Sequence, residues 1–101
     1  MRILIADDDP NVLTVLEGQL SGWGHEVRAA PDGLAALALL QQPEAPGMVL
    51  LDWKMPGMDG VEVCRRARAH PEAPAFYAII LTGQGSREGL VGALEAGADD
   101  Y

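Results

Sequence analysis

The chain has 101 residues, of which 49% are hydrophobic and 22% are charged, and its formal net charge is −8. This length allows one compact domain, and the composition excludes a largely disordered chain. The acidic balance argues against binding nucleic acid through its phosphates, which requires a basic surface, and against docking on anionic membranes. The single cysteine, Cys64, excludes an intrachain disulfide and a thiolate metal cage.

The sequence contains no evident membrane span or signal peptide. Its apolar runs are all much shorter than the ~20 residues that a helix needs to cross a bilayer. The first five residues combine one cation with a very short apolar run, unlike a secretory leader. We therefore expect a cytoplasmic protein.

Four short apolar runs are predicted to form strands. They cover residues 3–6, 27–30, 48–51 and 77–81. Apolar and polar residues do not alternate within these runs. This pattern is typical of strands that are buried on both faces of a parallel sheet.

Amphipathic stretches with helical spacing lie between and after the predicted strands. Asp9 as N-cap and Pro10 at the first position are expected to begin the first helix, which the Gly22-Trp23-Gly24 segment ends. Helical spacing predicts four helices and places Cys64 in the core. The helices are marked by Val12, Val15, Leu16 and Leu20, by Leu34, Leu37 and Ala38, by Val61, Cys64 and Ala67, and by Leu90, Val91, Leu94 and Ala98. Alternating strands and helices predict one α/β domain with a parallel sheet and helices on both of its faces.

Oxygen-bearing side chains follow three of the predicted strands. Asp7, Asp8 and Asp9 follow the first strand, Asp52 follows the third, and Thr82 follows the fourth. Ligands of open parallel α/β sheets bind outside the carboxyl ends of the strands, so these side chains are expected at one rim. Crowded carboxylates repel one another unless some are protonated or a cation lies between them. Because Mg²⁺ prefers oxygen ligands, we predict a magnesium site at this rim.

Asp9 and Asp52 differ in how strongly they indicate a chemical role. Capping of the following helix explains Asp9 as well as metal binding does, whereas one cap does not account for Asp7 and Asp8. Asp52 closes an apolar strand and precedes a turn rich in Pro and Gly. A carboxylate beside a metal can attack phosphorus and form an acyl phosphate, and the hydroxyl of Thr82 could bind a phosphoryl oxygen.

The whole chain resembles the receiver domain of bacterial two-component response regulators. The resemblance is carried by residues 3–9, by residues 51–60 with their Leu-Asp and Met-Pro-Gly-Met-Asp-Gly motifs, by residues 80–82, and by residues 96–101. It implies a flavodoxin-like, doubly wound parallel sheet of five strands with five helices.

The resemblance also implies the chemistry of the site. Asp52 would accept a phosphoryl group from a histidine kinase or a phosphotransfer protein. Mg²⁺ would lie between Asp7, Asp8, Asp52 and the backbone carbonyl of Lys54, partly through water. The only expected reactions are the phosphorylation and dephosphorylation of the chain itself, so we do not expect a metabolic enzyme.

Two further residues match the family's switch. Thr82 would bind the phosphoryl oxygen and shift toward it, and Tyr101 matches the aromatic residue whose ring turns inward on activation. Together they would convert phosphorylation into a changed output surface. The output domain or target protein is not visible in the sequence.

One departure from the family lies at the end of the chain. The family carries a Lys-Pro pair three residues beyond the position of Tyr101, whereas the only lysine here is Lys54. We therefore expect residues 1–101 to be a C-terminally incomplete receiver domain that lacks most of the last strand and the last helix. The alternative is a partner chain or swapped element in a homodimer that supplies the missing strand.

Three other functions compete with the phosphorylation switch. A phosphate-independent interaction module is compatible with the missing lysine. A Mg²⁺-dependent phosphohydrolase typically has a second acid two residues after its nucleophile, where this chain has Lys54. A flavin-binding domain needs a hydroxyl- and glycine-rich loop after the first strand, and the acidic residues 7–9 are electrostatically wrong for it.

Overall fold

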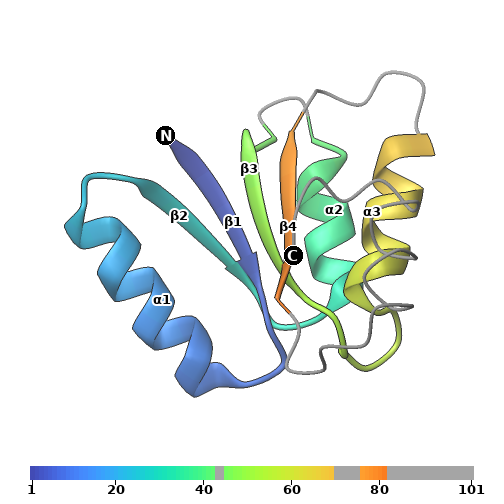
Figure 1. Ribbon diagram of the computed structural model, residues 1–101, viewed down its shortest axis with the longest axis horizontal. Helices are drawn as coiled ribbons and strands as arrows, with labels where there is room; N and C mark the ends of the chain where they lie inside the picture. Colours follow the sequence, from blue (N-terminus) through green and yellow to red (C-terminus); the bar gives the residue numbers. More distant parts are fainter. Residues whose placement is uncertain (43–44, 70–75, 82–101) are drawn as a thin grey trace.

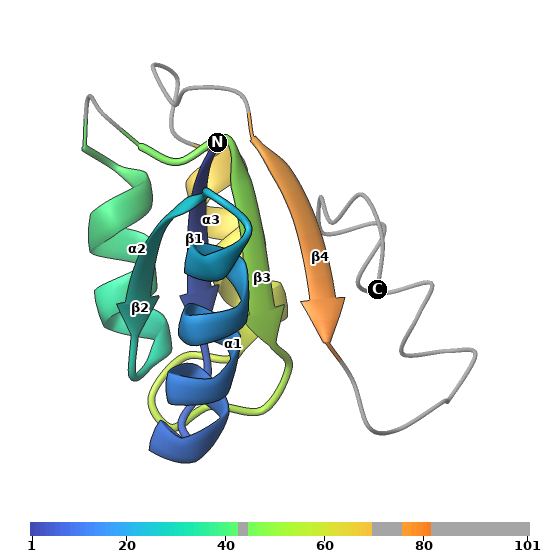
Figure 2. The same cartoon turned by 90° about the vertical axis from the view of Figure 1, so that its left-hand side faces the viewer.

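A computed structural model describes residues 1–42, 45–69 and 76–81 of the chain. Within them, a parallel sheet has the strand order β2-β1-β3-β4. The elements, in chain order, are β1 (Arg2–Ala6), α1 (Pro10–Gly22), β2 (Glu26–Ala30), α2 (Gly33–Leu40), β3 (Met48–Asp52), α3 (Gly60–Ala69) and β4 (Tyr77–Leu81). Helix α1 lies on one face of the sheet, and α2 and α3 lie on the other (Figure 1, Figure 2). This order and layering follow the flavodoxin-like doubly wound fold, as predicted.

The predicted strands agree with the observed ones to within one residue at each end. The start of α1 is also confirmed, because the Asp9 side chain accepts a hydrogen bond from the Asn11 backbone N–H over 2.9 Å and Pro10 opens the helix. Gly24 follows the end of α1 with a positive φ of 91°. The predicted fourth helix lies outside the described residues. None of the described helices combines the length and the hydropathy that crossing a membrane requires.

The main core lies between the sheet and the helices α2 and α3. On this face the strands contribute side chains that are almost completely buried, namely Leu4, Ala6, Val49, Leu51, Ala78 and Ile80. The two helices contribute Ala36, Leu40, Val63, Cys64 and Ala67. Cys64 is therefore a core residue, as its helical spacing predicted.

The opposite face of the sheet is covered unevenly. Ile5 in β1 is buried, and its neighbours across the sheet, Leu50 in β3 and Ile79 in β4, are only partly buried. At the ends of β4, Tyr77 is 45% exposed and Leu81 is 37% exposed. The prediction that every strand is buried on both faces is therefore wrong beyond β1. The physical reason is that α1, the helix described on this face, packs against β1 and β2.

Two of the apolar residues that mark the helices in the sequence are exposed. Val15 in α1 is 57% exposed, and Leu34 in α2 is 62% exposed. After its first glycine, α2 consists only of Ala and Leu, so its sequence does not distinguish a buried face from an exposed one. The structure buries Gly33, Ala36 and Leu40 of this helix.

Two glycines allow the helices to approach the segment that follows β3. A Cβ atom on Gly33, at the start of α2, would overlap the carbonyl oxygen of Met58. A Cβ atom on Gly60, at the start of α3, would overlap the carbonyl oxygen of Asp52. Both contacts are with backbone, which cannot rotate away as a flexible side chain can.

We expect Gly33→Ala to lower the free energy of unfolding by about 1–3 kcal/mol, the usual cost of forcing an extra carbon into a packed site. Gly18 is the matched control, because it lies inside α1 and a Cβ atom added there would meet no other atom within 4 Å. Gly18→Ala should raise the free energy of unfolding by about 0.5–1 kcal/mol through helix propensity. Urea denaturation measures both values, and equal effects of the two changes would contradict the close approach.

Candidate functional site

Three carboxylates meet at the carboxyl edge of the sheet. Strands β1 and β3 are parallel neighbours, and Ala6 lies opposite Leu51 in their register. Asp7 and Asp8, which follow β1, are therefore brought beside Asp52, the last residue of β3. One oxygen from each carboxylate lies within 4.8 Å of the others. The structure thus brings together the three acidic side chains that the sequence placed at one rim.

Local hydrogen bonds hold the segment after β1 and separate Asp9 from this cluster. The Asp7 backbone N–H donates to the carbonyl of Ala30 over 3.2 Å, which extends the pairing of β1 with β2. The Asp7 carboxylate accepts from the Asp9 backbone N–H over 2.9 Å. The Asp9 carboxylate accepts from Asn11 at the start of α1. Of the two explanations for Asp9, helix capping is the one that the structure supports.

The segment around Asp52 is fixed on both sides. The backbone N–H of Trp53 donates to the carbonyl of Leu81 over 3.1 Å, so the pairing of β3 with β4 continues past Asp52. The carbonyl of Trp53 accepts from Gly60 over 2.8 Å, which closes the loop between β3 and α3. At the end of this loop, the Asp59 carboxylate caps α3 by accepting from the Glu62 backbone N–H.

Within this loop, Lys54 is exposed and lies two residues after Asp52. Met55 and Met58 on either side of the Pro-Gly turn are buried, at 8% and 6% exposure. Both side chains pack the loop onto the protein, because they join the main core below it. The loop that carries Lys54 is therefore anchored by apolar side chains as well as by hydrogen bonds.

Burial and neighbouring charge raise the pKa of the Asp52 carboxyl above its ordinary value. Loss of water around the partly buried carboxylate is the largest cause, and the negative charges of Asp7 and Asp8 add to it. The backbone N–H of Trp53 acts in the opposite direction. A divalent cation among the three carboxylates would offset their repulsion, and carboxylate oxygens are the ligands that hard cations prefer. The arrangement therefore fits a metal ion.

Two predicted site residues, Thr82 and Tyr101, lie outside the described residues. Thr82 directly follows Leu81, which lies opposite Asp52 in the register of β3 and β4. Gly60 was not among the predicted site residues, yet its lack of a side chain lets α3 start against the Asp52 carbonyl. The signal that could have shown it is a glycine directly after the capping Asp59.

Comparison with known proteins shows the family. The family model described as "Response regulator receiver domain" matches residues 3–101. The chain belongs to this family.

One curated relative is a transcriptional regulator by name, and another is a DNA-binding response regulator by name. The receiver chain is 44% identical over 100 residues to the probable transcriptional regulator ycf27 of Galdieria sulphuraria, covering 99% of this chain and 38% of that protein. It is 40% identical over 100 residues to the DNA-binding response regulator MtrA of Mycolicibacterium smegmatis, covering 99% of this chain and 42% of that protein. The chain thus spans about two fifths of the length of these relatives.

Solved structures agree with the fold. A putative response regulator from Chloroflexus aurantiacus is 39% identical with a TM-score of 0.87, covering 99% of this chain and 81% of that chain. The Vibrio cholerae chemotaxis protein CheY4 is 27% identical with a TM-score of 0.90, covering 99% of this chain and 82% of that chain. The flavodoxin-like receiver fold predicted from the sequence is therefore confirmed.

We expect Asp52→Asn to stabilise the chain in cation-free buffer at pH 7. The raised pKa means that the folded chain binds the Asp52 proton more tightly than the unfolded chain does, so its ionisation costs stability as pH rises above 3.8. The gain should be on the order of 1 kcal/mol, the Coulomb energy of two unit charges about 4 Å apart in water. It should shrink as the pH is lowered toward 3.8.

Urea denaturation with a chelator present measures this effect. Glu17→Gln on the exposed surface of α1 removes the same charge away from the cluster and is the matched control. A gain as large in Glu17→Gln as in Asp52→Asn would attribute the effect to the net charge of the chain and not to the cluster.

Proposed function

We propose that this receiver is a phosphorylation-activated signalling switch whose phosphoryl acceptor is Asp52. The observation that carries the proposal is the position of Asp52 at the end of a central strand, within 4.8 Å of Asp7 and Asp8, in a chain that belongs to the receiver family. The donor is a histidine kinase or a phosphotransfer protein. A carboxylate oxygen of Asp52 forms the new bond to phosphorus as the bond from phosphorus to the donor nitrogen breaks, and the electron pair stays with that nitrogen.

Mg²⁺ is the metal that we propose for the three carboxylates. Asp7, Asp8 and Asp52 would hold it together with the backbone carbonyl of Lys54, partly through water. When bound, it would offset the negative charge of the carboxylates and of the phosphoryl oxygens. The chain's own contribution is to hold the acceptor carboxylate still, through the strand pairing of Asp52 and the anchored loop after it.

The remaining parts of the switch are also proposals. Thr82, the residue after the strand partner of Asp52, would bind a phosphoryl oxygen through its hydroxyl. Tyr101 would turn inward on activation and change the surface that the next component of the pathway contacts. We infer that residues 1–101 act as the receiver unit in the cytoplasm and that phosphorylation and dephosphorylation of Asp52 are the only reactions it carries out.

The response lies in another domain or another protein. The relative MtrA is named a DNA-binding response regulator, and we propose an output of this general kind, transcriptional regulation. The receiver itself is a poor surface for nucleic acid, because its net charge is −8.

Incubation with Mg²⁺ and acetyl phosphate, followed by intact-mass measurement, tests the acceptor. We expect one phosphoryl adduct, which should be absent from Asp52→Asn and from a sample containing excess chelator. Asp9→Asn is the matched control, because Asp9 neighbours the cluster but caps α1, and asparagine caps helices equally well. This variant should form the adduct.

Circular dichroism must show that each sample is folded. A folded wild-type chain without an adduct would contradict the proposed switch and favour the phosphate-independent interaction module.

Calorimetric titration with Mg²⁺ tests the metal ligands separately from phosphorylation. Asp8→Asn should weaken Mg²⁺ binding by at least about tenfold, equivalent to about 1.4 kcal/mol, because it removes one of the three clustered carboxylates. Asp9→Asn should leave the affinity within about twofold, a change under about 0.5 kcal/mol. Equal losses in both variants would contradict the proposed ligand set.

A further inference from the structure

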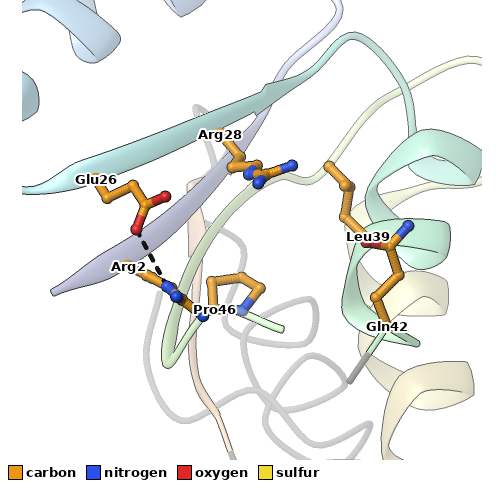
Figure 3. Close-up of a pocket in the computed structure, with 6 residues that line it drawn as sticks. All are labelled: Arg2, Glu26, Arg28, Leu39, Gln42 and Pro46. Atoms are coloured by element: carbon orange, nitrogen blue, oxygen red, sulfur yellow. Dashed lines mark hydrogen bonds and ion pairs between the residues drawn. The ribbon is translucent and has the colours of Figure 1, made fainter. Parts of the chain in front are cut away.

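A second polar site lies near the amino ends of the strands, whereas the carboxylate cluster lies at their carboxyl ends. It is a pocket of about 40 Å³ between the starts of β1 and β2, the end of α2 and the residue Pro46 that leads into β3. Its lining residues are Arg2, Glu26, Arg28, Leu39, Gln42 and Pro46 (Figure 3). It shares no residue with the proposed phosphorylation site.

Among the residues that the structure describes, one positive charge in the pocket is not compensated. Arg2 and Glu26 lie opposite each other in the register of β1 and β2, and they form an ion pair of 3.1 Å. Arg28 extends from β2 toward Leu39 and Gln42 of the α2 end (Figure 3). Across the part of the chain that the structure describes, Arg28 forms no ion pair. Among the described lining residues, two arginines and one glutamate therefore give a formal charge of +1 in a chain of net charge −8.

The walls of the pocket favour an interaction with this charge. Leu39 and Pro46 provide apolar surface, which weakens screening by water, and Gln42 provides an amide. The volume exceeds the 10–15 Å³ or so that one water needs, and it suits one small head group. A guanidinium offers a planar pair of N–H donors, which matches the two oxygens of a carboxylate.

We propose that this pocket binds a single carboxylate group, with Arg28 as its ion-pair partner. The single uncompensated charge matches a monoanion, whereas Glu26 and the acidic chain disfavour a dianion such as hydrogen phosphate. Arginine on the edge strand β2 also discourages pairing with another sheet. That role explains why β2 carries a charge. It does not explain why Arg28 lines the same pocket as Arg2 and Gln42. The carboxylate comes from a small organic acid or from an acidic side chain of a partner protein.

Nuclear magnetic resonance titration of the ¹⁵N-labelled chain with sodium acetate, at constant ionic strength set with sodium chloride, tests the proposal. We expect saturable shifts at Arg28 and at the Gln42 side-chain amide, with a dissociation constant in the range of about 1–10 mM. Arg28→Gln should weaken acetate binding by at least about tenfold. Arg65→Gln is the matched control, because it removes the same charge from α3, where Arg65 pairs with Glu62, and it should leave binding unchanged.

Three results would overturn the proposal: shifts that rise linearly without saturation, equal binding in Arg28→Gln, and tighter binding of phosphate than of acetate. If Arg28→Gln does not fold, Arg28→Lys replaces it, because lysine keeps the charge but lacks the paired N–H donors. Weaker acetate binding by Arg28→Lys than by the wild type supports the proposal. Unchanged acetate binding by Arg28→Lys overturns it. Asp52→Asn should bind acetate normally, which separates this site from the phosphorylation switch.

A parallel titration with the α-amide of N-acetylglutamate distinguishes the two sources of the carboxylate. Binding as tight as that of acetate assigns the pocket to acidic side chains of a partner. Binding at least about tenfold weaker than that of acetate assigns it to small organic acids, since the free-energy difference would then exceed about 1.4 kcal/mol.

Discussion

The pairing of β1 with β3 is the constraint on which the candidate site depends. Asp7 and Asp52 are far apart in the chain, and their carboxylates repel each other, so nothing in their own chemistry brings them together. The register that sets Ala6 opposite Leu51 does so. A slip of one residue would turn the inward side chains of a strand to its other face, and the burial of Leu4, Val49 and Leu51 opposes such a slip. Apolar packing thus holds an arrangement that electrostatics alone would disperse.

A neutral scaffold surrounds this charged edge. Met55 and Met58 bury the loop after Asp52, and the hydrogen bond from Gly60 to Trp53 closes it. These contacts involve no charged side chain, so they hold equally well whether the carboxylates are ionised, protonated or bound to a cation. The geometry of the loop after Asp52 is therefore insulated from the charge changes that the proposed chemistry requires.

The sequence predicted the elements whose signals are local. Apolar runs located the strands, Asp9 and Pro10 located the start of α1, and acids at strand ends located the cluster. It failed where the outcome depends on packing between elements. The Ala- and Leu-rich α2 has no polar face to set its orientation, so the exposure of Leu34 could not be read from it. The pocket at Arg28 depends on strand register and on where α2 ends, and neither is visible in the sequence. Thr82 and Tyr101 remain predictions.

Gly60 shows that intolerance to substitution and chemical participation are separate properties. It carries no functional group, yet the start of α3 lies so close to the Asp52 carbonyl that any side chain would collide with it. If Asp52 is the acceptor, as proposed, selection for its function would constrain Gly60 as firmly as Asp52. In a saturation mutagenesis map of this receiver, the two positions would look alike. Only an assay that separates folding from phosphoryl transfer would distinguish the proposed acceptor from the residue that makes room for it.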